Sequence, residues 1–445
     1  MDRSEIERLI DAHGIEVVRV TFNDNANVAR ARNIPARFFR ESVLDQGVQY
    51  PSAMMSVDAA GNFVLAAGAG FAGGYASWLL RVDPSTFAVV PWLPKTARVI
   101  ADLCTLDGTP VPVAPRTVLG RVLAELEQEG LRAYGAAEHE FYVFRRFDAQ
   151  GYEPSWQGVQ CYSEVKQAEV DALLHDFTMN LAGVGIHAEA ANTEYGPGQF
   201  EISIQPRWGI AQADASFTFK ATIKETAAHH GLLATFMTKP LNGRSGSGCH
   251  FHHSLYAGDT GKNALFDAAD ARGLSTIAKH FLAGQLHHSA ALCALANPTV
   301  NSYRRLRPYT FAPSNVTWGL ENRMCMVRVP NARGEGTHFE NRLPGGDCNP
   351  YLMMAAVYAA GLDGLRRRLP LPAAVEGQDA YALTDAPALP KGLGEALDAL
   401  RADEALTALL GAEFVRSYTA LKAHELARFE DHVTDWEVQE YRELF

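Results

Sequence analysis

The sequence predicts a protein of two domains, one of them large, that contains both helices and strands. Three observations support this. Its 445 residues exceed what one ordinary hydrophobic core organises. Strand-like runs rich in aromatic and β-branched residues alternate with helical patterns. Residues 106–116 hold three prolines and a glycine, which is typical of a linker, so we expect domains over residues 1–106 and 107–445.

The elements of the first domain are expected in a simple order. Ser4 is a candidate N-cap for an opening helix with an apolar stripe. Residues 17–22 alternate as a strand, and a turn-rich crossing leads to a second strand over residues 97–103. Residues 63–80 carry no charge and are long enough to span a membrane, but they are rich in glycine and alanine. We interpret them as a glycine-rich loop region and expect no membrane association.

The larger domain is expected to mix strands and helices to its end. Thr117 is expected to cap its first helix. The predicted helices cover residues 117–130, 163–181, 211–230, 351–367 and 413–429. The predicted strands cover residues 135–144, 233–237, 324–329 and 338–343, and two more follow glycine-containing turns and carry Glu201 and His250.

Composition excludes several classes of function. The apolar fraction of 47% and charged fraction of 20% are those of a soluble globular protein. A net charge of −11 without any basic run argues against nucleic-acid binding. The six cysteines form no Cys-x-x-Cys pair, and the N-terminus is charged from its second residue. Both features predict a cytoplasmic protein.

The strand over residues 135–144 is the first candidate site. Side chains alternate along a strand, so Glu138 and Glu140 are expected on one face and His139 and Phe141 on the other. Neighbouring carboxylates repel each other unless a cation lies between them. Taken alone, the pair fits an exposed strand with solvated acids better, because Glu-x-Glu is common. Other residues change this balance.

Five carboxylates and one imidazole occupy strand or strand-entry positions of the second domain, namely Glu138, Glu140, Glu194, Glu201, Glu340 and His250. Carboxylate oxygens with at most one nitrogen suit Mg²⁺ or Mn²⁺ better than zinc. Six such ligands are enough for two or more ions. His252 follows His250 on the same strand face and is expected to reach the same pocket.

An arginine cluster accompanies these acids and comprises Arg304, Arg305, Arg307, Arg323, Arg328 and Arg342. Arg304 and Arg307 are expected in surface ion pairs. Buried arginines are costly unless they meet anions, and their guanidinium groups suit carboxylates and phosphates. A divalent-metal cage beside arginines indicates phosphoryl transfer from a nucleotide. The sequence has no P-loop motif, and its glycine-rich segment at residues 243–248 is a weak signal alone.

Longer motifs resemble the glutamine synthetase superfamily over nearly the whole chain. They appear in the family's order at residues 83–102, 138–141, 194–201, 246–252, 301–306, 321–330, 340–342 and 433–437. The resemblance implies an α+β fold, with a small β-grasp-like domain and a large catalytic domain containing a curved, mainly antiparallel sheet flanked by helices. It also implies a homo-oligomer, a dodecamer of two stacked hexamers whose active sites lie between subunits.

The resemblance also implies roles for particular residues. Glu140, Glu194 and Glu201 would hold one metal ion, and Glu138, His250 and Glu340 a second, with two or three Mg²⁺ or Mn²⁺ ions per site. Residues implied to bind glutamate or its γ-phosphate are Ser245, Gly246, Arg305 and Arg342. Those implied for ATP are His252, Ser254, Arg323 and Arg328. Of all these, Arg305, Arg323 and Arg342 would be catalytic.

The implied reaction has two steps: ATP phosphorylates the γ-carboxylate of L-glutamate, and an amine then attacks the acyl phosphate. Members that use ammonia carry a glutamate one residue before an Ala-Pro pair, where this chain has Phe311. They also carry an aspartate in the first domain, whereas residues 49–53 here have no acid. Ser245 replaces the usual asparagine of the glycine loop.

These departures favour the subgroup that makes γ-glutamyl amides from small organic amines. An arylamine is neutral at pH 7 and would stack on Phe311, with Tyr50, Pro51 and Met54 or Met55 of a neighbouring subunit completing the amine pocket. A hydrophobic alkylamine is the alternative within this class. Two other hypotheses are an ordinary, ammonia-using glutamine synthetase and a non-catalytic structural ring.

Overall fold

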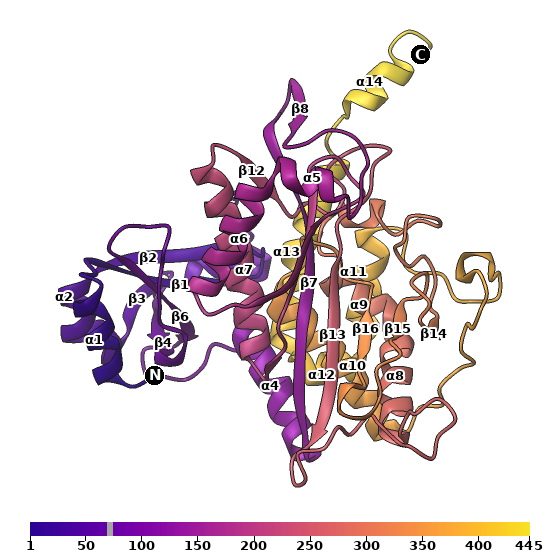
Figure 1. Ribbon diagram of the computed structural model, residues 1–445, viewed down its shortest axis with the longest axis horizontal. Helices are drawn as coiled ribbons and strands as arrows, with labels where there is room; N and C mark the ends of the chain where they lie inside the picture. Colours follow the sequence, from indigo (N-terminus) through magenta and orange to yellow (C-terminus); the bar gives the residue numbers. More distant parts are fainter. Residues whose placement is uncertain (69–73) are drawn as a thin grey trace.

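The computed structural model describes residues 1–68 and 74–445. Among these residues, the strands form one sheet of six strands and one of ten (Figure 1). The predicted glycine-rich loop over residues 63–80 lies partly outside the described residues. Its last part was predicted wrongly, because residues 77–80 belong to strand β4.

The smaller sheet belongs to the N-terminal region, at the left of Figure 1. Its strands are β1 (Val17–Asn23), β2 (Ala29–Pro35), β3 (Val48–Pro51), β4 (Ser77–Val82), β5 (Ala88–Val89) and β6 (Thr96–Cys104). Strand β1 runs parallel to β6 and antiparallel to β2. The helices of this region are α1 (Arg3–Ala12), α2 (Ala36–Phe38) and α3 (Leu44–Gln46).

Helix α1 begins differently from the prediction. Asp2 is its N-cap, and the Asp2 carboxylate accepts a hydrogen bond from the Glu5 backbone N–H at 2.9 Å. The Ser4 hydroxyl donates to the same carboxylate at 2.8 Å. The predicted Ser4 cap was therefore wrong, because an aspartate two residues earlier already meets the free backbone donor.

The larger sheet has the order β14-β15-β16-β13-β7-β10-β9, and β8, β11 and β12 also pair with β7. Its strands are β7 (Leu131–Asp148), β8 (Gly151–Pro154), β9 (Ala188–Thr193), β10 (Gln199–Ile204), β11 (Arg207–Trp208), β12 (Leu233–Thr235), β13 (Cys249–Ala257), β14 (Trp318–Leu320), β15 (Val327–Val329) and β16 (Phe339–Asn341). The pairs are antiparallel except β14 with β15. With 18 residues, β7 extends well beyond its predicted strand, whereas β12, β15 and β16 are shorter than predicted.

The helices of this region mostly lie behind the sheet in Figure 1 and bury its apolar face, but the second and the last bury no residue and the last projects away from the sheet. They are α4 (Pro115–Gln128), α5 (Glu164–Glu169), α6 (Asp171–Gly183), α7 (Ala211–His229), α8 (Thr276–His287), α9 (Ser289–Ala296), α10 (Pro350–Arg367), α11 (Leu393–Ala402), α12 (Glu404–Leu410), α13 (Ala412–Glu430) and α14 (Asp435–Tyr441). Helix α10 is the most deeply buried, since its residues from Pro350 to Gly364 are all buried.

Two predicted helices differ in detail. Helix α4 begins at Pro115 with Ala114 as its N-cap, so the Thr117 cap was wrong. Proline suits the first helical position because its missing N–H has no partner there in any case. The helix predicted over residues 163–181 is divided at Val170 into α5 and α6.

Polar contacts join the two regions. The Arg116 guanidinium lies 2.6 Å from Asp83 and 2.7 Å from Asp102 of the first region, and 2.9 Å from Asp214 of α7. The α+β fold class is confirmed. The domain boundary at residue 106 stays a prediction. In the part of the chain that is described, we find no helix with the length and apolarity needed to cross a membrane.

Candidate active site

One cavity of about 430 Å³ collects most of the predicted site residues. Its lining includes Glu138, Glu140, Glu194, Glu201, Ser245, Gly246, His250, Arg305, Phe311, Arg323, Arg328, Glu340 and Arg342. Every residue predicted to hold a metal ion is in this set. Six of the eight sequence motifs, which are far apart along the chain, thus meet at one place, whereas those at residues 83–102 and 433–437 do not line it.

Strand pairing explains this convergence. In the antiparallel register, Glu140 of β7 lies opposite Glu201 of β10. On the other edge of β7, Glu138 lies opposite His250 of β13, and His252 lies opposite Glu340 of β16. Because side chains alternate along a strand, these groups project from the same face of the sheet.

The opposite face of β7 behaves as predicted. The His139 ring stacks on Phe219 with ring centroids 4.4 Å apart, and its Nε2 lies 2.7 Å from the Ser216 hydroxyl. Phe141 is fully buried among aromatic rings of the core. Burial holds the pKa of His139 well below its usual value, so the ring is neutral.

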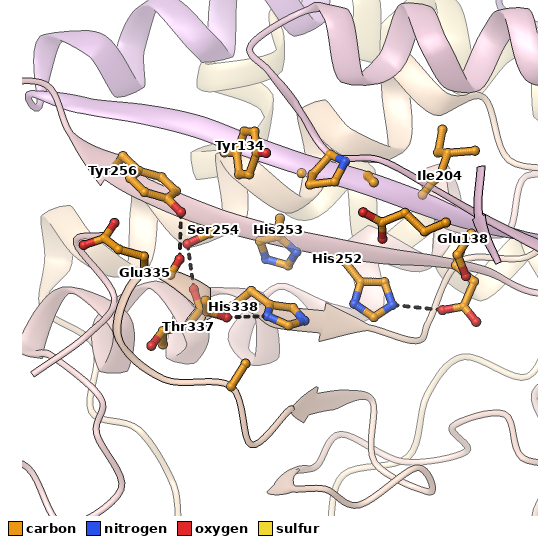
Figure 2. A pocket seen from close by; sticks show the side chains of 18 residues that line it. Tyr134, Glu138, Ile204, His252, His253, Ser254, Tyr256, Glu335, Thr337 and His338 are labelled. Atoms are coloured by element: carbon orange, nitrogen blue, oxygen red, sulfur yellow. Dashed lines mark hydrogen bonds and ion pairs between the residues drawn. The ribbon is translucent and has the colours of Figure 1, made fainter. Parts of the chain in front are cut away.

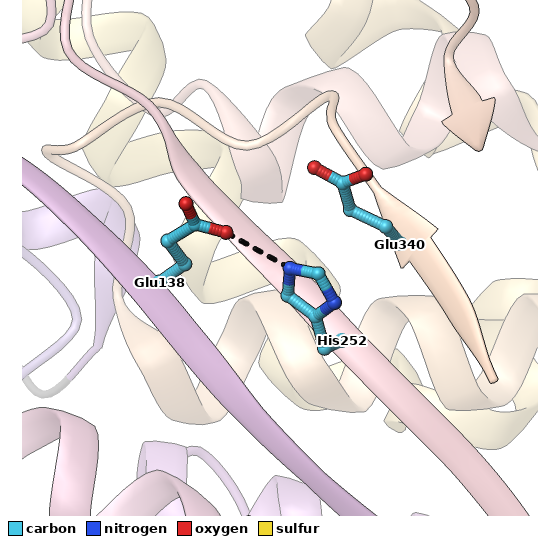
Figure 3. Close-up of side chains that lie close together, drawn as sticks. All are labelled: Glu138, His252 and Glu340. Atoms are coloured by element: carbon cyan, nitrogen blue, oxygen red, sulfur yellow. Dashed lines mark hydrogen bonds and ion pairs between the residues drawn. The ribbon is translucent and has the colours of Figure 1, made fainter. Parts of the chain in front are cut away.

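The candidate ligand atoms form two overlapping groups. Single atoms of Glu138, Glu201 and His250 lie within 4.8 Å of one another, and so do those of Glu138, His252 and Glu340. Figure 3 shows the second group, in which His252 Nε2 lies 2.9 Å from Glu138. His250 also lies 3.6 Å from both Glu140 and Glu340. Glu138 thus belongs to both groups.

The charges in this cavity are unbalanced without cations. Burial raises the pKa of Glu201 to about 11, and the nearby Glu138 and Glu140 add to the rise. Burial likewise raises the pKa of Glu140 to about 7, although Arg305 opposes the shift. His250 Nδ1 is buried without a hydrogen-bond partner among the described residues. Crowded carboxylates and a free imidazole nitrogen fit divalent ions such as Mg²⁺ or Mn²⁺.

The buried arginines of this cavity differ in whether a carboxylate pairs with them. Glu340 is in close ion pairs with Arg328 and Arg342, and although burial opposes it, the Arg342 charge lowers the pKa of Glu340 to about 2. Arg305 is 3% exposed and donates to the Leu343 and Arg342 carbonyls at 3.2 Å. Among the described residues no carboxylate lies within 4.0 Å of its guanidinium, so its charge is available to an anionic substrate.

Of the other predicted arginines, Arg323 lines the cavity and is exposed. Arg304 and Arg307 are exposed as well, but neither forms an ion pair with a described residue, so that expectation was wrong. The Arg304 backbone N–H donates to the Asn301 carbonyl at 3.1 Å and that of Arg307 to the Arg305 carbonyl at 2.7 Å, and within the described chain no carboxylate lies within 4.0 Å of either guanidinium.

Close packing explains why the loop before β13 has a glycine at position 248. A Cβ on Gly248 would lie 2.7 Å from His250 Nε2 and 2.8 Å from Arg305 Nη2, so any side chain there would displace both groups. The Gly248 backbone N–H donates to Glu140 at 2.9 Å. The loop therefore orients a carboxylate while leaving room for a buried cation.

A second cavity of about 430 Å³ adjoins the first, and Glu138 lines both (Figure 2). His252 and Ser254, predicted for the nucleotide, line this second cavity together with Tyr134 and Tyr256. The Ser254 hydroxyl already donates to the Thr337 carbonyl at 2.8 Å. The residues predicted for ATP thus divide between the two cavities, with the arginines on the acidic side.

Phe311 has the position that the amine hypothesis requires. Its side chain is 61% exposed, lines the acidic cavity, and has its ring centroid 6.1 Å from that of Tyr195. Its backbone has φ 57°, which is unusual for a residue with a side chain, and its carbonyl accepts a hydrogen bond from Arg342 at 3.1 Å. An ion-pair network therefore supports this loop.

Tyr50 and Pro51 lie in β3 and do not line this cavity within the described chain. The Tyr50 ring packs edge-to-face on Phe22 with centroids 5.0 Å apart. Their placement in a neighbour's amine pocket stays a prediction.

Sequence reasoning missed four lining residues, which are Cys161, Tyr162, Tyr195 and Thr310. Tyr195 follows Glu194 directly, so its motif contained the signal. Cys161 and Tyr162 lie in an irregular segment with no periodic pattern, although the Cys161 thiol is 3.5 Å from Glu194.

Comparison with known proteins defines the class. Residues 112–441 match the family model described as glutamine synthetase, catalytic domain. The chain belongs to this family, and its resemblance to the γ-glutamyl amide ligase subgroup is confirmed. It is an ATP-dependent carbon–nitrogen ligase.

Particular relatives cover almost the whole chain. It is 37% identical to γ-glutamylethanolamide synthetase of Streptomyces coelicolor, over 98% of this chain and 94% of the relative. It is 32% identical to glutamate–isopropylamine ligase of a Pseudomonas species, over 99% and 98% respectively. A solved structure titled apo GmaS without ligand superposes with a TM-score of 0.86 at 31% identity, covering 98% of both chains.

Proposed function

We propose that this enzyme joins the γ-carboxylate of L-glutamate to an organic primary amine, with ATP consumed to form a γ-glutamyl phosphate intermediate. The observation that carries the proposal is the exposed Phe311 ring in the same cavity as the acid cage and Arg305. The cage and the arginines suit phosphoryl transfer, whereas an apolar ring suits the carbon body of an amine.

The acid cage would hold divalent ions, through Glu140, Glu194 and Glu201 on one side and Glu138, His250 and Glu340 on the other. When bound, such ions neutralise phosphate charge and polarise the oxygens of the transferred group. The metal roles of these six residues follow from the family resemblance and agree with the chemistry of the donor set.

The arginines would orient the anionic substrates. Arg305 lacks a carboxylate partner in the described chain, and with Arg342, Ser245 and Gly246 it would bind glutamate and its γ-phosphate. Arg323 and Arg328 would contact the phosphates of ATP, with His252 and Ser254 on the nucleotide side. A guanidinium group stabilises the charge that develops during phosphoryl transfer.

The amine is proposed to be neutral and aromatic, such as an aniline. Every acidic residue that lines the acidic cavity is one of the five carboxylates of the cage, so within the described chain none is left to attract an ammonium ion. Desolvating a cation against Phe311 costs several kcal/mol, of which cation–π attraction offsets only ~1–2 kcal/mol. An arylamine needs no prior deprotonation and stacks on the ring.

A hydrophobic alkylamine is the second candidate, since one relative is named for isopropylamine and another for an ethanolamide product. The test is kcat/KM for aniline, isopropylamine, ethanolamine, putrescine and ammonia at pH 7 to 8. We expect aniline to be preferred and Phe311→Ala to lower its kcat/KM about tenfold, the loss of roughly one stacking contact. A preference for putrescine or ammonia would contradict this interpretation of Phe311.

Assembly is part of the proposal. We propose a homo-oligomer, a dodecamer of two hexamers, in which Tyr50 and Pro51 of one subunit complete the amine pocket of its neighbour. Sedimentation under assay conditions tests it, because an active monomer is incompatible with a shared pocket.

A further inference from the structure

A third cavity lies away from the proposed active site, between the N-terminal sheet and helix α7. Its volume is about 650 Å³. Apolar side chains of both regions form much of its wall, including Phe87 and Val89 on one side and Ile186 and Ile210 on the other. None of the residues proposed to bind glutamate, ATP, metal or amine lines it.

Arg98 of β6 lines this cavity and is 5% exposed. Its side-chain contacts are a long hydrogen bond to the Thr21 hydroxyl at 3.5 Å and the face of the Phe217 ring at 5.8 Å. Within residues 1–68 and 74–445, no carboxylate lies within 4.0 Å of it. Burial lowers the pKa of Arg98 to about 10, which still leaves it charged at neutral pH. A buried, unpaired cation is costly.

The nearest carboxylates are already bonded elsewhere. Glu225 accepts from Arg19 at 2.5 Å and from the Trp92 indole at 2.8 Å. Asp214 accepts two hydrogen bonds from Arg116 at 2.9 Å and one from the Tyr351 hydroxyl at 2.7 Å. Among the described residues neither carboxylate lies within 4.0 Å of the Arg98 guanidinium, although both favour its charged form from farther away.

Arg207 of β11 brings a second cation to the same cavity from the other region of the chain. It is half-buried, and its guanidinium donates to the Gly185 carbonyl. Like Arg98, it has no carboxylate within ion-pair distance in the described residues. Two arginines without a carboxylate partner among the described residues, one from each region, therefore line one cavity. Asp214 lines it as well, with its carboxylate held by Arg116 and Tyr351.

We propose that this interdomain cavity binds a small organic dicarboxylate. Guanidinium groups bind carboxylates through paired hydrogen bonds, and the two arginines offer one such group for each end of the ligand. The apolar walls suit a short carbon chain between the two charges, as concave sites commonly combine apolar lining with a few polar anchors. A ligand held there contacts β6 and α7 at once and bridges the two regions.

Binding of glutarate to the full-length protein tests the proposal, measured by isothermal titration calorimetry without ATP or amine. Because glutarate also resembles glutamate, Arg305→Gln serves as the control for the substrate site. We expect glutarate to bind Arg305→Gln, and its affinity to fall at least tenfold in Arg98→Gln and in Arg207→Gln. The proposal would be overturned if glutarate binding were lost in Arg305→Gln and unchanged in Arg98→Gln and Arg207→Gln.

Two further measurements separate a ligand site from a structural role. Inorganic phosphate is expected to bind more weakly than glutarate, because it has no carbon chain. Tighter binding of phosphate would contradict the assignment of an organic dicarboxylate as the ligand. Arg98→Met is expected to have a melting temperature at least equal to that of the unmodified protein, without any rise on adding glutarate. A lower melting temperature of Arg98→Met would assign Arg98 a structural role and overturn the proposal. If the Arg98 variants do not fold, Arg207→Gln still tests glutarate binding, because Arg207 is only half-buried.

Discussion

The two faces of strand β7 differ although they share one backbone. On one face, Glu138 and Glu140 lie in a cavity where burial and neighbouring carboxylates raise the pKa of Glu140 to about 7, whereas His252 and His250 overcome burial and lower the pKa of Glu138 to about 2. On the other, His139 and Phe141 are fully buried and satisfied by aromatic contacts and a hydrogen bond. One face thus holds groups ready for cations at a cost in stability, and the other supplies stability.

The largest expected effect is on catalysis from the acidic face. Glu140→Ala or Glu201→Ala should lower amide formation at least 100-fold at saturating Mg²⁺, since losing a ligand removes several kcal/mol of transition-state stabilisation. The purified variants should remain folded, which circular dichroism checks. Near-normal turnover in both variants would contradict the metal assignment.

Next comes a loss of stability from the apolar face. Phe141→Ala should lower the free energy of unfolding by ~3–5 kcal/mol, because it opens a cavity among Phe177, Phe200 and Phe236. Denaturant titration measures this change. The matched substitution Phe311→Ala, at a side chain that is 61% exposed, should change stability far less. Equal losses of unfolding free energy in Phe141→Ala and Phe311→Ala would contradict the assignment of Phe141 to the core and Phe311 to the cavity.

Metal binding should sharpen the contrast further. Mg²⁺ at 100 times its Kd should stabilise the protein by ~2.7 kcal/mol, because ions bind the folded cage and relieve its repulsion. Thermal melts with and without Mg²⁺ measure this. In Glu201→Gln, melting without Mg²⁺ should occur at nearly the same temperature, since the raised pKa already keeps the Glu201 carboxyl neutral there, and the Mg²⁺ response should shrink. An unchanged Mg²⁺ response would place the ions elsewhere.

The smallest effect is expected at the hydrogen bond of His139. Ser216→Ala should cost about 1 kcal/mol, because one buried hydrogen bond to a neutral ring is lost. Denaturant titration again measures it, with kcat at saturating substrate as the companion value. A large fall in kcat without loss of stability would mean that His139 acts on the catalytic face after all.

The sequence alone determined the content of the site. Strand alternation predicted which side chains of residues 135–144 project into the acidic cavity and which into the hydrophobic core. The two-residue repeat is a property of the strand backbone and needs no tertiary contact. The motifs predicted the six candidate ligands, and the structure brings all of them to one cavity. Helix starts were predicted less well, as Ser4 and Thr117 show, because several neighbouring residues compete for a cap.

Only the tertiary structure decided how charges are partnered. The sequence does not reveal which carboxylate, if any, pairs with Arg305, Arg328 or Arg98. In the fold, Arg328 is paired with Glu340, whereas Arg305 and Arg98 are buried without a carboxylate beside them among the described residues. Ion pairs form between residues distant in the chain, so strand register and helix packing determine them. The sequence specified the chemical groups, and the fold determined which of them remain free to bind a ligand.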